Sequence, residues 1–188
     1  MKKIWLLIFA GFFVACGNPN DPGEVNRLIE QAWEAFQKGE YKQAEVTFTE
    51  ALNRDAGRVE AKSGLGWSRA FLRNYQGAVD VWQEGLAIEA NYVDIHAGLC
   101  LVYQVLKKFE SCISAGQKVA ELAPDYQFPY YDGVNIATIR GLMASAYYGL
   151  GQFDQAAKMM DEADPQNAPH SSDPKTLLQT IMTFLGLK

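Results

Sequence analysis

The feature that most constrains this chain is a pattern that recurs along it. An aromatic residue is followed three positions later by a small residue and four positions after that, in most copies, by a large apolar one. The first three copies lie 34 residues apart, and the fourth follows after 44. The copies are Tyr41, Ala44 and Phe48; Tyr75, Ala78 and Trp82; Phe109, Cys112 and Gly116; and Phe153, Ala156 and Met160. Self-similarity at this period indicates an array of helical hairpins.

Apolar residues upstream of each copy show why one hairpin is not enough. In the first repeat Leu28, Ala32 and Ala35 recur at i, i+4 and i+7, so they share one face of a helix. A second apolar stripe with the same spacing begins at Ile29 and lies about 100° further round the helix. Two helices cannot bury both stripes, so each hairpin must stack on a neighbour.

This pattern resembles the tetratricopeptide repeat family over residues 25–168. The resemblance implies an all-α fold, a right-handed α-solenoid of about four helical hairpins with a C-terminal capping helix, about nine helices in all and no strand. The repeats are assigned to residues 25–58, 59–92, 93–126 and 137–168, with an insertion at 127–136 and a linker and capping helix at 169–188. Gly116 stands where Phe48 and Trp82 stand in earlier copies, which predicts a weaker or differently filled contact.

The end of the chain has its own helix signal. Asp173 followed by Pro174 is typical of an N-cap with proline in the first turn. The segment that follows places its apolar residues on one face, as a cap on a solenoid requires. These residues are Leu177, Leu178, Ile181, Phe184 and Leu185.

The first residues have the order of a secretory signal peptide. A basic start precedes an unbroken apolar run from Ile4 to Ala15, which is too short to span a bilayer. Cys16 follows Val14-Ala15 directly, and this resembles the lipobox of bacterial lipoproteins. The resemblance implies cleavage after residue 15 and lipidation of Cys16. The alternative is an ordinary signal peptide with an incidental cysteine.

Removal of residues 1–15 would take Lys2 and Lys3 away and change the net charge from −5 to −7. An acidic surface without a basic run argues against nucleic acid as a partner. Residues 16–24 are mostly turn formers and predict a short tether. Gly17 after the cysteine favours, by resemblance to known sorting rules, an outer membrane lipoprotein that faces the periplasm.

The faces of the first helices left free by hairpin packing predict a concave groove. It is aromatic and aliphatic in its N-terminal half and would suit an amphipathic helix or an extended peptide. The residues predicted to bind a partner there are Trp33, Phe36, Trp67, Phe71, Leu101, Val105 and Tyr148. The alternative is that these side chains only fill the interior, or that the tether or the C-terminal helix folds back over them.

The insertion is the second candidate contact. Phe128, Tyr130 and Tyr131 would form an aromatic loop around Pro129, available to a partner or packed on itself, and Asp132 is expected to cap the next helix. Some family members bind a C-terminal carboxylate with lysine, asparagine and arginine. The matching positions here are Ile29, Trp33, Gly64, Asp94 and Gly98, so that ligand class is excluded.

Two cysteines occupy small sites that face each other in the earlier repeats. Cys100 and Cys112 are therefore expected to be neighbours, either bridged by a disulfide or present as two buried thiols. His96 lies on the same predicted helix as Cys100, but it should face the preceding repeat, so a metal site or an activated thiol is not expected. His170, in the linker, is expected to be solvated.

The function predicted from these features is non-catalytic and needs no cofactor, metal or small-molecule substrate. The protein would be a periplasmic scaffold that holds a protein partner near the membrane. Resemblance to lipidated repeat proteins implies work in an envelope assembly or export machine. The alternative is a structural envelope component that associates only with copies of itself.

Overall fold

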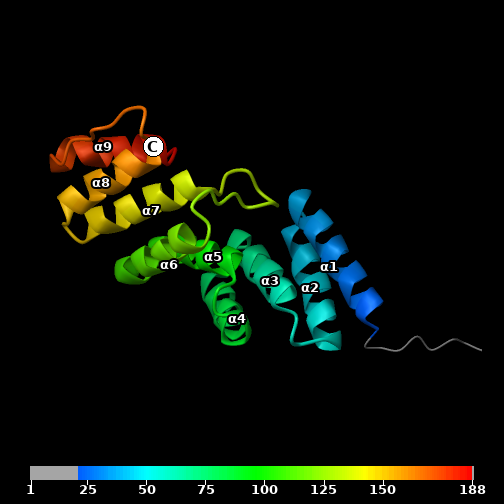
Figure 1. Ribbon diagram of the computed structural model, residues 1–188. Coiled ribbons are helices and arrows are strands. Elements are labelled where there is room, and N and C mark those ends of the chain that lie inside the picture. Colours follow the sequence, from blue (N-terminus) through cyan, green and yellow to red (C-terminus); the bar gives the residue numbers. More distant parts are fainter. Residues whose placement is uncertain (1–20, 188) are drawn as a thin grey trace, which may run out of the picture.

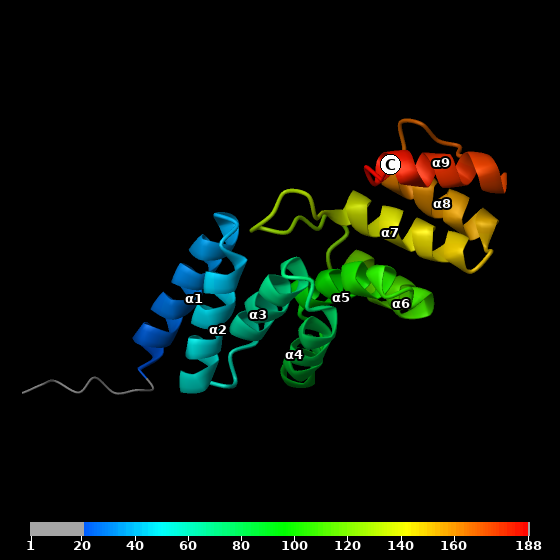
Figure 2. The ribbon, with the colours of Figure 1, turned by 180° about the vertical axis from the view of Figure 1, so that it is seen from behind.

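Residues 21–187 are described by a computed structural model, and this part of the chain forms nine α-helices and no β-strand. The helices are α1 (Pro22–Gln37), α2 (Tyr41–Arg54), α3 (Val59–Phe71), α4 (Tyr75–Ile88), α5 (Val93–Val105), α6 (Phe109–Leu122), α7 (Ile136–Gly149), α8 (Phe153–Ala163) and α9 (Pro174–Phe184). The first eight pair as successive hairpins that stack into a curved array, and α9 lies on the last pair (Figures 1 and 2). The predicted all-α solenoid is confirmed.

Each hairpin turns through one residue in the left-handed region at the same place in its repeat. These residues are Gly39, Arg73, Lys107 and Gly151, with φ of 79°, 62°, 56° and 74°. The amide that follows each one donates back to the carbonyl five residues earlier, as Asn74 does to Arg69 at 2.8 Å. This closes the first helix with a Schellman motif and turns the chain into the second.

Small residues let the helices approach one another closely. A Cβ added to Gly64 would overlap the ring of Phe48, and one added to Gly66 would overlap the indole of Trp82. The Trp82 indole is fully buried, and its N–H donates to the Ser63 carbonyl at 3.1 Å. The recurring pattern of small and large residues therefore reflects the close packing of the helices in the hairpins.

In the third repeat, which lacks the large residue at this position, a different side chain fills the space. A Cβ on Gly116 would meet the side chain of Met143, which reaches in from α7. The contact predicted to be weak or differently filled is thus filled by the next repeat.

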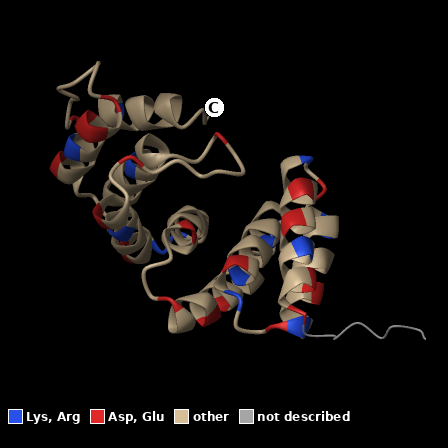
Figure 3. Ribbon diagram, turned by 45° about the vertical axis from the view of Figure 1, so that its right-hand side comes forward, with Lys and Arg blue, Asp and Glu red and all other residues tan. Residues whose placement is uncertain are grey.

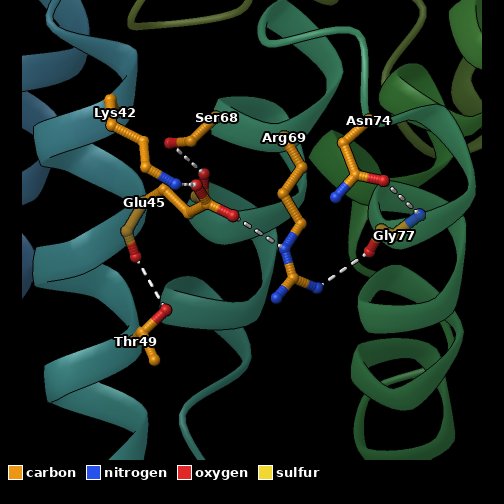
Figure 4. Close-up of polar contacts among 8 residues, drawn as sticks. Lys42, Glu45, Thr49, Ser68, Arg69, Asn74 and Gly77 are labelled. Carbon is orange, nitrogen blue, oxygen red and sulfur yellow. Dashed lines mark hydrogen bonds and ion pairs between the residues drawn. The ribbon is translucent and has the colours of Figure 1, made fainter.

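Polar contacts reinforce the stacking of the first two repeats. Arg69 of α3 reaches Glu45 of α2 at 3.4 Å and donates to the Gly77 carbonyl of α4 at 3.0 Å (Figure 4). Asn74 accepts from the Gly77 amide at 3.1 Å and so caps α4. The pKa of the Glu45 carboxyl is lowered, first by the hydrogen bond from Lys42 and then by the one from Arg69.

The capping helix begins as predicted. Asp173 accepts from the Thr176 amide at 3.0 Å, and α9 buries Leu177 and Ile181 against the last hairpin. The prediction for His170 is wrong: its side chain is only 6% exposed, because its ring nitrogen and its amide both bond Asp161, at 2.8 and 2.6 Å. This pair fastens the linker to α8.

The signal peptide and Cys16 lie outside the described residues, so cleavage and lipidation stay predictions. Among residues 21–187, none of the helices combines the length and the apolar character needed to cross a membrane.

Candidate functional site

The concave side of the array is lined by the first helix of each hairpin, and a loop from the middle of the chain reaches back across it. This loop, residues 127–135, is called the finger here. Its base is closed by an antiparallel bridge between Gln127 and Asn135 and by a hydrogen bond from the Phe128 amide to the Val134 carbonyl, at 2.9 Å. In Figures 1 and 2 the finger extends from α7 toward the upper ends of α1 and α3.

Aromatic stacking holds the finger on the first two repeats. The Phe128 ring lies on Trp67 with centroids 4.3 Å apart and planes 27° apart. Tyr130 stacks on Trp33 at 3.7 Å, with planes only 2° apart. Because each such pair adds about 0.5–1.5 kcal/mol beyond the area it buries, the finger is bound firmly by its own chain.

The prediction of an open groove in the N-terminal half is therefore corrected. Trp33, Phe36 and Trp67 are only 4%, 2% and 0% exposed, beneath or beside the finger. The insertion covers them, where the sequence suggested the tether or the C-terminal helix as the cover. Phe128 is itself fully buried and Tyr130 half-buried, so among the insertion aromatics only Tyr131, 46% exposed, is free to meet a partner.

The base of the finger is fixed by a buried polar pair. Tyr126 donates its hydroxyl to Asp94 of α5 at 2.8 Å. Burial raises the pKa of the Asp94 carboxyl, and burial together with this carboxylate raises the pKa of Tyr126. Asn135, and not Asp132, caps α7 by accepting from the Thr138 amide at 3.0 Å, because the finger ends three residues later than the predicted cap.

Beyond the finger the concave side stays open. A pocket of about 440 Å³ lies between α3, α5 and α7, with the finger as one wall and the end of the chain as another. Three of the predicted groove residues line it, namely Phe71, Leu101 and Val105, and Val105 is 49% exposed. The other large apolar walls are Tyr75, Tyr131, Val134, Leu142, Leu185 and Leu187. Tyr148 lies elsewhere, against Phe153.

The pocket also has a small polar site. Gln104 donates its amide to the Ser145 hydroxyl at 2.7 Å, and both residues line the pocket. The Gln104 amide oxygen is buried and finds no hydrogen-bond partner among the described residues. Because a buried acceptor without a donor is costly, a ligand N–H that reached this oxygen would be favoured.

The two thiols are neighbours, as the repeat register predicted. Their sulfur atoms are 3.6 Å apart, both residues are fully buried, and both are free thiols in this structure. The hydrogen bond to Cys112 and burial hold the pKa of Cys100 well above its usual range. Cys100 is therefore a neutral, inert thiol at neutral pH. The His96 ring bonds the Ala90 carbonyl at 2.9 Å, away from this pair.

The sequence matches no family model and no curated protein. Solved structures are similar in fold. A crystal structure of MamA superposes with a TM-score of 0.65 at 24% identity, over 76% of this chain and 78% of that one. The MamA RS-1 ArsTM double mutant superposes with a TM-score of 0.65 at 17% identity, over 90% of this chain and 96% of that one.

A third similar structure is the first TPR of Spaghetti (RPAP3), bound to the HSP90 peptide SRMEEVD. It gives a TM-score of 0.55 at 19% identity, over 58% of this chain and 87% of that one. At these identities the likeness establishes the fold. Together with the stacked hairpins and their 34-residue period, it shows that this chain has the tetratricopeptide repeat fold.

Proposed function

We propose that this protein is a non-catalytic scaffold of the bacterial cell envelope, and that it binds a protein partner through an apolar segment seated in the pocket between α3, α5 and α7. The observation that carries the proposal is the pocket itself, about 440 Å³ with mostly apolar walls, on the concave side of a repeat array. Exposed apolar concavities of this kind usually mark interaction sites.

The pocket walls are better suited to binding a peptide segment than to catalysing a reaction. Phe71, Leu101 and Val105 offer apolar contact, while Gln104 and Ser145 offer one polar site at which backbone can be held. Anchor side chains in such pockets supply most of the affinity of peptide recognition. A similar array, the first TPR of Spaghetti (RPAP3), is bound to a peptide, which supports the same use of this fold.

The scaffold would be held at the membrane by lipid on Cys16, with residues 16–24 as the tether. The sequence around Cys16 supports this. The net charge of −7 that remains after cleavage would give the chain little attraction to anionic lipid, so attachment would depend on the acyl chains. Outer membrane attachment facing the periplasm, and work in an assembly or export machine, belong to the same proposal.

Site-specific photo-crosslinking in the source bacterium tests the pocket. A photoreactive amino acid at Val105, 49% exposed inside the pocket, is compared with the same group at Val46 of α2, 53% exposed outside it. The proposal predicts a discrete crosslinked species from position 105 and none from position 46. Identical products from both positions, or none from 105, would contradict it.

Metabolic labelling with a radioactive fatty acid tests the anchor separately. Label should enter the wild-type chain and be lost in Cys16→Ser, while the pocket crosslink survives in detergent-solubilised protein. A chain that takes up no label would remove the lipid anchor from the proposal and leave the pocket standing.

The self-associating alternative makes a different prediction. Light scattering on the purified mature chain should give the mass of a monomer if the pocket serves a foreign partner. A larger particle, together with position-105 crosslinks only to the chain itself, would favour the structural role.

A further inference from the structure

Two turn residues beside the pocket are held in an unfavourable conformation. Among the described residues, Arg73 and Lys107 are the non-glycine residues with positive φ. Their counterparts in the first and fourth repeats are Gly39 and Gly151. A side chain in the left-handed region costs about 1–2 kcal/mol relative to glycine's freedom there. Two of the three repeats that line the pocket thus keep a cation where glycine would close the same turn without strain.

Both cations are in turns whose neighbouring residues line the pocket, although neither cation is itself part of the lining. Arg73 stands between Phe71 and Tyr75, which line it, and Lys107 comes two residues after Val105, which also lines it. Both side chains are exposed, and within residues 21–187 neither forms an ion pair. By contrast, Arg69 and Arg140, which are also close to the lining, are paired with Glu45 and Glu162.

Acidic residues are scarce near the lining residues in the sequence. Within two positions of any lining residue, the described chain has one carboxylate, Asp132, at the tip of the finger. Figure 3 shows the finger without charge colours except at that tip. The turns after α3 and α5 therefore bring two unpaired cations next to the pocket lining, on a chain that is acidic as a whole.

Resting on the proposed function, we infer that the partner segment is an amphipathic helix with acidic residues on both sides of its apolar anchor, recognised by Arg73 and Lys107. Adjacent helices such as α3 and α5 pack about 8–10 Å apart. The two cations would therefore pair with carboxylates separated by about the same distance. In a helix, seven residues rise about 10.5 Å. Acids at i and i+7 then share a face with apolar residues at i+3 and i+4, which enter the pocket.

Recognition of an acidic partner by Arg73 and Lys107 would explain both the backbone strain at these turns and their unpaired charges. Arginine and lysine at these turns lower stability slightly and gain complementary charge at the mouth of the pocket. Replacing them with glycine relieves the backbone and removes the charge, so it should weaken binding of an acidic partner without lowering stability.

The test uses two fluorescein-labelled alanine- and glutamine-rich helical peptides with leucines at i+3 and i+4. One has aspartates at i and i+7, and the other has lysines there. Fluorescence anisotropy with the mature chain should show the aspartate peptide binding at least tenfold more tightly at low salt. Arg73→Gly and Lys107→Gly should each weaken it about 2- to 5-fold and leave the melting temperature unchanged or raised. At 0.5 M salt most of the preference should disappear.

Controls distinguish this inference from the proposed function. Arg73→Lys should retain the preference, and Lys158→Gln, which removes an exposed cation of α8, should not change it. Equal binding of both peptides, or a preference that survives the double glycine variant, would overturn the charge assignment and leave the pocket in place. Binding of neither peptide, with no crosslink from position 105, would overturn both.

Discussion

The two halves of the concave side have the same repeat architecture and opposite accessibility. In the N-terminal half Trp33 and Trp67 are covered by the finger, whereas in the C-terminal half Leu101 and Val105 line an open pocket. Repeats alone would have made one continuous groove. The difference shows that an insertion between two repeats can decide which part of a solenoid is core and which part is surface.

The largest expected difference between the halves is in stability. Trp67→Ala should lower the free energy of unfolding by about 3–5 kcal/mol, because the side chain is fully buried between Phe128 and Trp82. Val105→Ala, in the open half, should change it by less than about 0.5 kcal/mol. Urea unfolding followed by circular dichroism measures both. Similar small losses would mean that Trp67 is not core.

The finger itself provides the next test. Phe128→Ala should cost about 3 kcal/mol and expose Trp33 and Trp67, because the stacked ring is the buried anchor of the finger. Tyr131→Ala, at a residue 46% exposed, should cost less than about 1 kcal/mol. Acrylamide quenching of tryptophan fluorescence should rise in the first variant only. Equal quenching in both would show that the finger does not protect the tryptophans.

The base of the finger should show a pH-dependent penalty. Tyr126→Phe leaves the buried Asp94 carboxylate without its donor and should cost about 1–3 kcal/mol at neutral pH. Burial already raises the pKa of Asp94, so the folded state holds this proton more tightly than the unfolded state does. The penalty should therefore be small below that raised pKa and grow as pH rises through it. A penalty independent of pH between 4 and 8 would contradict this role of Asp94.

The smallest expected effect on stability is in the linker that precedes α9, the helix that caps the C-terminal half. The pKa of Asp161 is lowered, first by the His170 amide and then by its ring. This contribution to stability is present above the ordinary aspartate pKa and is lost as pH falls through the lowered one. His170→Ala keeps the amide bond and removes only the ring bond, so it should cost less than about 1 kcal/mol at pH 7. The difference from wild type, measured by thermal unfolding, should vanish in acid. A difference that persists in strong acid would assign the loss to packing.

The sequence was sufficient for what is local or periodic. The 34-residue period predicted the hairpins and the neighbouring thiols, and the Asp173-Pro174 pair predicted the start of the capping helix. Each of these follows from contacts within one repeat or between adjacent ones, where spacing along the chain determines spacing in space.

The contacts that were missed are long-range or depend on irregular backbone. Phe128 meets Trp67 across most of two repeats, and no period relates an insertion to the surface it covers. The one available signal was composition, since the insertion has three aromatic residues and the first two repeats offer a row of aromatic partners. His170 was missed for a similar reason, because the path of a linker is not periodic.

Carbene footprinting of the purified mature chain, read out by mass spectrometry for each residue, tests the divided concave side most directly. The structure predicts strong modification of Val105, Tyr131 and Leu187 and protection of Trp33, Phe36 and Trp67, with protection of the tryptophans lost in Phe128→Ala. Modification of Trp33 and Trp67 in the wild-type chain to the level of Val105 would contradict the account and restore the continuous aromatic groove.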